Sequence, residues 1–86
     1  MGEYLIELYV SGGDKAAAED SRLSACAAAA ALSRRGTRIE YRRSILLASE
    51  ETCFLLFEAD TVDVVREMAR LAALRSDQIS TVTGMA

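Results

Sequence analysis

The chain has 86 residues, a length that suits a single domain spanning residues 1–86. Its 51% hydrophobic and 27% charged residues exclude a disordered polar chain, and its net charge of −3 argues against nucleic acid as a partner. No apolar run reaches the ~18 residues that a membrane span needs. The N-terminus opens directly as a strand, so we expect a cytoplasmic protein without a membrane partner.

The first half of the chain predicts a strand, a helix and a second strand. Residues 3–10 alternate with a period of two, as a strand with one apolar face does. Residues 15–35 are rich in alanine, follow an N-cap at Asp14 and precede Gly36, which favours a helix. Residues 38–48 alternate again, and strict alternation assigns one face to Ile39, Tyr41, Arg43, Ile45 and Leu47.

The second half predicts a strand, a helix and a last strand. Residues 49–51 form a short polar turn, so the strand at 52–59 should pair antiparallel with the one before it. A helix follows the cap at Asp60-Thr61 and ends near Leu74. Residues 77–83 are polar and β-branched, which indicates a less apolar strand.

This order predicts an α+β fold, a ferredoxin-like βαββαβ sandwich with a four-stranded antiparallel sheet and two helices on one face. The apolar sets of the first and third strands should face the helices. The other face would then expose a large apolar patch, which we expect a second copy to cover in a homodimer of the dimeric α/β barrel type. Its apolar members are Leu5, Tyr9, Tyr41, Ile45, Phe54 and Leu56, interspersed with Glu7, Arg43 and Glu58.

The open face is also where the sequence places a candidate binding site. A cation among aromatic residues suits a small organic anion. The candidate ligand-binding residues are Tyr9, Tyr41, Arg43, Phe54 and Leu56. Alternatively, Arg43 pairs with Glu7 or Glu58 and only stabilises the interface. An enzyme that needs no cofactor would use Glu7 or Glu58 as its general base, and an interaction protein would add a partner strand at residues 77–83.

Other chemistries have little support in the sequence. The chain contains no histidine, which excludes a Ser-His-Asp set and an ordinary zinc site. Cys26 and Cys53 stand in different elements, and we interpret them as buried thiols, although a bridge between them stays open. Tyr9 and Phe54 could imitate the stacking residues of RNA-binding ferredoxin-like domains, but the acidic balance opposes that function.

Several short segments, taken in order, are similar to a known family. These are residues 4–7 (YLIE), 41–44 (YRRS), 51–59 (ETCFLLFEA), 65–74 and 77–79. The chain resembles the small actinobacterial proteins of ferredoxin-like fold whose studied members are called nickel-responsive. That resemblance implies a homodimer through the open sheet face and raises divalent metal binding. Family members often carry a histidine in the stretch that holds Arg43, so this chain lacks the imidazole that nickel favours. We therefore assign no metal ligands and no cofactor.

Overall fold

The computed structural model describes residues 2–83, apart from the side chains of residues 76 and 77, so the ends of the expected domain lie outside the described residues. The strands are β1 (Gly2–Tyr9), β2 (Ile39–Leu47), β3 (Thr52–Ala59) and β4 (Ser76–Val82). The α-helices are α1 (Lys15–Arg34) and α2 (Val62–Leu71), and single 3₁₀ turns η1 (Ser11–Gly13) and η2 (Ala48–Glu50) follow β1 and β2. The expected order of strands and helices is confirmed.

Local side-chain chemistry explains where the helices begin. The Asp14 carboxylate accepts a hydrogen bond from the Ala16 amide at 3.0 Å, and Thr61 Oγ1 accepts from the Val64 amide at 3.4 Å. Both caps satisfy amides that have no partner inside the helix. Their removal would leave the first turn of each helix open to fraying.

The ends of the two helices differ in one respect. After α1, Gly36 adopts φ +87°, and the Thr37 amide returns to the Leu32 carbonyl at 3.0 Å. After α2, the same kind of turn is made by Ala73, at φ +55°. A left-handed residue normally ends a helix as glycine, because a Cβ is strained there. The helix α2 therefore ends at Leu71, three residues before the predicted Leu74, and the strained Ala73 follows two residues later.

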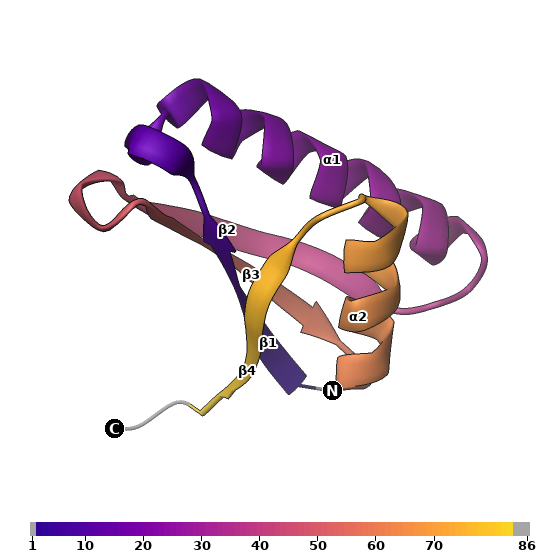
Figure 1. Cartoon of the computed structure of the whole chain (residues 1–86). Coiled ribbons are helices and arrows are strands. Elements are labelled where there is room, and N and C mark those ends of the chain that lie inside the picture. The colour runs from indigo at the N-terminus through magenta and orange to yellow at the C-terminus, as the bar shows by residue number, and fades with distance from the viewer. Residues whose placement is uncertain (1, 84–86) are drawn as a thin grey trace.

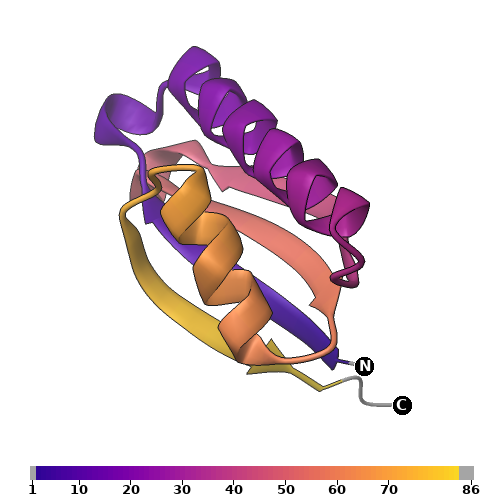
Figure 2. The same ribbon diagram turned by 90° about the vertical axis from the view of Figure 1, so that its right-hand side faces the viewer.

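The sheet has the strand order β2-β3-β1-β4, with every neighbouring pair antiparallel. Both helices cover the same face, so the molecule has one helical layer and one sheet layer (Figures 1 and 2). This is the ferredoxin-like α+β sandwich that the sequence predicts. Among residues 2–83, no helix lies over the opposite face of the sheet.

The core lies between the two layers. The predicted apolar faces of β1 and β3 are confirmed, because Ile6, Leu55 and Phe57 are 0% exposed. From α2, Val65 and Met68 complete this core at 0% exposure. The helix α1 contributes mainly buried alanines, which let its backbone lie close to the sheet. Neither helix combines the length and the hydropathy that a membrane-crossing helix requires within the described part of the chain.

A β-bulge in β2 overturns one expectation from the sequence. Tyr41 pairs with Phe57 and Arg43 pairs with Leu56, so Arg42 is an extra residue between two register positions. Strict alternation is wrong here: Tyr41 does not share a face with Arg43. Its ring packs on the helical side, edge to face with the ring of Phe57 at 5.6 Å between centroids. Tyr41 is consequently removed from the open-face candidates.

Candidate functional site

The uncovered face of the sheet holds most of the residues that the sequence singled out. The strand register arranges them in rows that cross the sheet from β2 to β4. One row is Arg43, Leu56, Leu5 and Ser80, and the next is Ile45, Phe54, Glu7 and Gln78. Neighbouring residues within a row lie about 5 Å apart. Apolar side chains therefore run from β2 through β3 to β1, with Arg43 on β2 and Glu7 on β1 among them and polar residues on β4.

Several large apolar side chains on this face are exposed to solvent. Tyr9 is 62% exposed, and Ile45 and Leu47 are each 43% exposed. Leu56 and Phe54, on the central strand β3, are half-buried by their neighbours on the sheet. Exposed apolar surface that is continuous over several strands is a common mark of an interaction site.

The two arginines at the bulge have different environments. Arg42 Nη2 lies 2.5 Å from Glu58 Oε2 and 3.3 Å from Glu40 Oε2. The hydrogen bond to Glu58, and then its charge, raise the pKa of Arg42 above its ordinary value. Arg43, by contrast, has no ion pair within the described residues. The alternative in which Arg43 pairs with Glu58 is not found within the chain, because Arg42 forms the ion pair with that carboxylate.

The two candidate carboxylates, Glu58 and Glu7, also differ in whether they have a partner. The side chain of Glu58 is 24% exposed and is committed to Arg42. Glu7 is half-buried between Phe54 and Gln78 in its row, with no hydrogen bond or ion pair among residues 2–83. Glu7 and Arg43 are thus two charges on this face that have no ion pair among residues 2–83; a third, Glu3, stands opposite Glu58 and interacts with Arg42 only through its charge. Of the two candidate carboxylates, Glu7 is the one that no cation in the described chain occupies.

Tyr9 is held by a residue that the sequence analysis treated only as part of a turn. Its hydroxyl donates to Glu51 Oε2 at 3.0 Å, and the Gly12 amide donates to the same oxygen at 2.6 Å. These hydrogen bonds, the first from Gly12, lower the pKa of Glu51. Glu51 thereby ties η1 to the β2–β3 turn and holds Tyr9 at the edge of the open face. Gly13 permits this approach, because a Cβ there would lie 2.3 Å from the Ala48 carbonyl oxygen.

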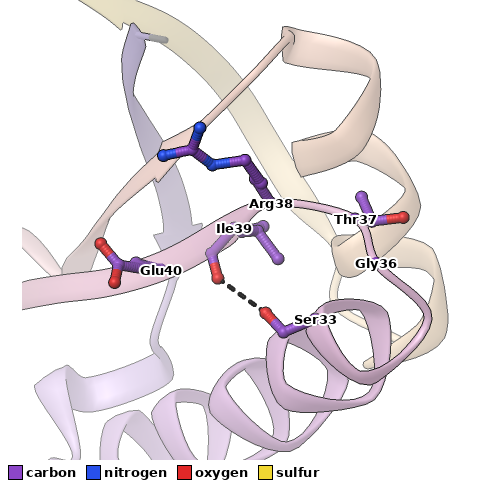
Figure 3. Close-up of a pocket in the computed structure, with 6 residues that line it drawn as sticks. All are labelled: Ser33, Gly36, Thr37, Arg38, Ile39 and Glu40. Atoms are coloured by element: carbon purple, nitrogen blue, oxygen red, sulfur yellow. Dashed lines mark hydrogen bonds between the residues drawn. The ribbon is translucent and has the colours of Figure 1, made fainter.

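The helical side of the molecule has pockets of its own. One of about 350 Å³ lies at the end of α1 and is lined by Ser33, Gly36, Thr37, Arg38, Ile39 and Glu40 (Figure 3). Ser33 Oγ donates to the Ile39 carbonyl at 3.1 Å and so stabilises the turn between α1 and β2. Arg38 extends away from the helix end (Figure 3). The polar groups of this pocket do not converge on one point, so it is a weak candidate for a ligand.

The cysteines and acids offer no evident metal centre. Cys26 and Cys53 are both free thiols; Cys53 is buried, as predicted, whereas Cys26 is partly exposed. Burial raises the pKa of the Cys53 thiol, which keeps it protonated. Among residues 2–83, no three or more Cys, Asp or Glu side chains are grouped so that they could hold a metal ion.

Comparisons with known proteins bear on the fold. No family model and no curated protein matches the sequence. A solved structure that is similar is the crystal structure of SCO4226 from Streptomyces coelicolor A3(2), an actinobacterium, with a TM-score of 0.76. The match covers 98% of this chain and 99% of that chain at 13% sequence identity. At this identity the likeness establishes a shared fold.

Proposed function

We propose that this protein is a homodimeric binding protein. Two copies pack open sheet face against open sheet face and hold a small organic anion between them. The observation that carries the proposal is the pair of unneutralised charges, Arg43 and Glu7, on an uncovered and otherwise apolar sheet face. Charges in such a place need a partner once the face is covered.

The area of the open face suits a second copy. Four strands about 4.8 Å apart, each some 25 Å long, give a face of about 500 Å². Two such faces amount to about 1,000 Å², near the lower limit for a specific protein interface. Side chains that stand out from the sheet increase that area. Because the two faces are identical, pairing about a two-fold axis closes the assembly.

The charges define what the dimer would hold. Arg43 and Glu7 stand two strands and one row apart, so their backbones are separated by about 12 Å. This distance favours a ligand between them over a direct ion pair. The planar guanidinium of Arg43 suits a carboxylate, and the carboxylate of Glu7 suits a hydroxyl or amine donor. Between them, Phe54 and Leu56 offer an apolar floor. The ligand class that fits best is an aromatic or branched carboxylic acid.

Sedimentation equilibrium tests the dimer. We expect the wild type to be dimeric at micromolar concentration and Leu5→Glu to be monomeric, because the new carboxylate would stand between Glu3 and Glu7 on the same strand face, opposite Leu56 and Ser80, with no cation beside it. The matched control is Leu23→Glu, since Leu23 is 52% exposed on α1, away from the sheet. A wild type that stays monomeric to 100 µM (roughly a tenth of the 1 mM weak-binding scale), or a dimeric Leu5→Glu, contradicts the proposal.

Thermal denaturation with benzoate as the probe tests the ligand. Benzoate should raise the melting temperature of the wild type and of Arg66→Gln, and not that of Arg43→Gln. Arg66 is the control because it is an exposed arginine on α2, with its side chain 62% exposed. Equal stabilisation of all three proteins would mean that Arg43 does not bind the anion.

A second function differs from the first only in what Glu7 does. Its carboxylate beside Phe54 could act as a general base on the bound acid, which would make the protein a cofactor-independent isomerase or cyclase. Tyr9 is less suited to assist, because its hydroxyl already donates to Glu51. Deuterium exchange from the bound ligand would separate the two functions. An enzyme loses that exchange in Glu7→Gln, whereas a binding protein shows none in either form.

A further inference from the structure

A second candidate site lies on the helical side of the sheet, between the first half of α1 and strands β2 and β3. It is a pocket of about 180 Å³. The pocket exists because α1 faces the sheet here with a small side chain, Ala18, which is 6% exposed. A methyl group cannot fill the space above Ser44 and Leu46, so a hollow remains between the layers.

The bulge at Arg42 determines what faces this hollow. By shifting the register of β2, it places Ser44 opposite Leu55, on the helical side. A hydroxyl therefore stands on the mostly apolar face that packs against the helices. Tyr41 Oη donates to Ser44 Oγ at 3.0 Å. Since Ser44 accepts this hydrogen bond, its own proton remains to be donated into the pocket.

The wall formed by α1 supplies a positioned guanidinium. Arg22 Nε donates to Glu19 Oε1 at 2.8 Å, and Nη2 contacts the same oxygen. The guanidinium carbon also lies 5.8 Å from the centre of the Tyr41 ring, a cation–π contact. Arg22 Nη1 has only a weak contact, 4.0 Å to Cys26 Sγ. The acid of this wall is thus already neutralised, while one guanidinium nitrogen is left for another acceptor.

The remaining lining completes a site for an anion with an apolar body. Lys15 adds a second cation on α1. Leu46 and the neutral thiol of Cys53 form the apolar floor. We propose that this pocket binds a small monoanionic carboxylate, which accepts hydrogen bonds from Lys15, Arg22 and Ser44. Its hydrocarbon tail lies on Leu46 and Cys53.

The volume limits the size of that carboxylate. A water molecule takes about 30 Å³ in the liquid, so 180 Å³ corresponds to about six non-hydrogen atoms. Isobutyrate has that size and a branched apolar tail. The site lies within one copy and on the opposite side of the sheet from Arg43, so it does not depend on the proposed dimer.

The test is an NMR titration of ¹⁵N-labelled protein with sodium isobutyrate at constant ionic strength. We expect saturating shifts of the Arg22, Ser44 and Leu46 amides, with a dissociation constant on the order of 1 mM. The neutral analogue isobutyramide should produce none of them. Arg22→Gln should weaken binding at least tenfold (about 1.4 kcal/mol). Arg66→Gln, which breaks the equivalent i,i+3 ion pair with Asp63 on α2, should leave it unchanged.

Two further variants keep the test decisive if Arg22→Gln folds poorly. Ala18→Leu fills the pocket and should abolish the shifts, and Lys15→Gln, at an exposed position, should weaken binding. The proposal is overturned if the shifts do not saturate, if isobutyramide matches isobutyrate, or if binding survives in Ala18→Leu. If Arg43→Gln abolishes binding and the variants of the helical-side pocket do not, the anion binds on the open face. That result would support the proposed function and refute the pocket on the helical side.

Discussion

Phe54 and Phe57 lie on the same strand, β3, but on opposite faces of the sheet, so truncating each to alanine compares the two faces directly. Phe57 is 0% exposed and contacts the ring of Tyr41. Phe57→Ala should cost about 3–5 kcal/mol of unfolding free energy, from lost burial and the cavity that remains. A chain of 86 residues has roughly 4–13 kcal/mol in total, so at the lower end of that range this variant is unfolded.

Phe54→Ala should behave differently. As a half-buried residue of one copy, Phe54 should contribute about 1–2 kcal/mol to the folding of the monomer. If the open faces pair, its loss should also weaken the dimer. The wild type would then lose about 1.4 kcal/mol of apparent stability per tenfold dilution, and Phe54→Ala would lose less.

Urea denaturation followed by circular dichroism, at two protein concentrations, measures both effects. Phe57→Ala should lower the transition midpoint by the same amount at each concentration. A milder variant, Phe57→Leu, gives a readable transition if Phe57→Ala is unfolded in buffer. The assignment of faces would be refuted if Phe54→Ala were as costly as Phe57→Ala at the lower concentration, or if Phe57→Ala cost less than about 1 kcal/mol.

Three further changes test local features. Ala73→Gly should raise the free energy of unfolding by about 0.5–1 kcal/mol in urea melts, because glycine relieves the strain at φ +55°; a loss of stability would contradict this. Asp14→Ala should cost about 1 kcal/mol by removing the α1 cap, and Asp14→Asn, which can still cap, should cost less. The pKa of Glu51 is lowered from its ordinary 4.5, so its contribution to stability is present above that pH and is lost as the pH falls through the lower, folded value. The acid side of a stability–pH curve should therefore be flatter in Glu51→Gln than in the wild type, and parallel curves would show that Gly12 and Tyr9 do not stabilise that carboxylate.

The fold follows closely from the sequence because its signals are local and repeated. The period-two faces of β1 and β3 identify the buried side of the sheet, and capping residues mark the helix starts. The helix α2 ends earlier than predicted, since Ala73 adopts a left-handed conformation that a glycine normally supplies. Nothing in residues 71–75 signals that turn.

The candidate site was harder to predict because one extra residue reverses the alternation of a strand. Because of the bulge at Arg42, Tyr41 lies on the helical side of the sheet, next to Ser44. The ion pair with Glu58 is formed by Arg42 and not by Arg43. The only signal in the sequence is the run of three polar residues at 42–44, which does not alternate. Glu51 was missed for a different reason, because its bonds join segments that are distant in the chain.

The central claim is that the open sheet face packs against a second copy of itself. An isotope-filtered NOE experiment on a mixture of ¹³C-labelled and unlabelled chains tests it most directly. The proposal predicts intermolecular contacts from the ring of Phe54 and the methyl groups of Ile45 and Leu56, all on that face. It is contradicted if the mixed sample gives no intermolecular contacts, or if they arise from Leu23 and Leu71 on the helices.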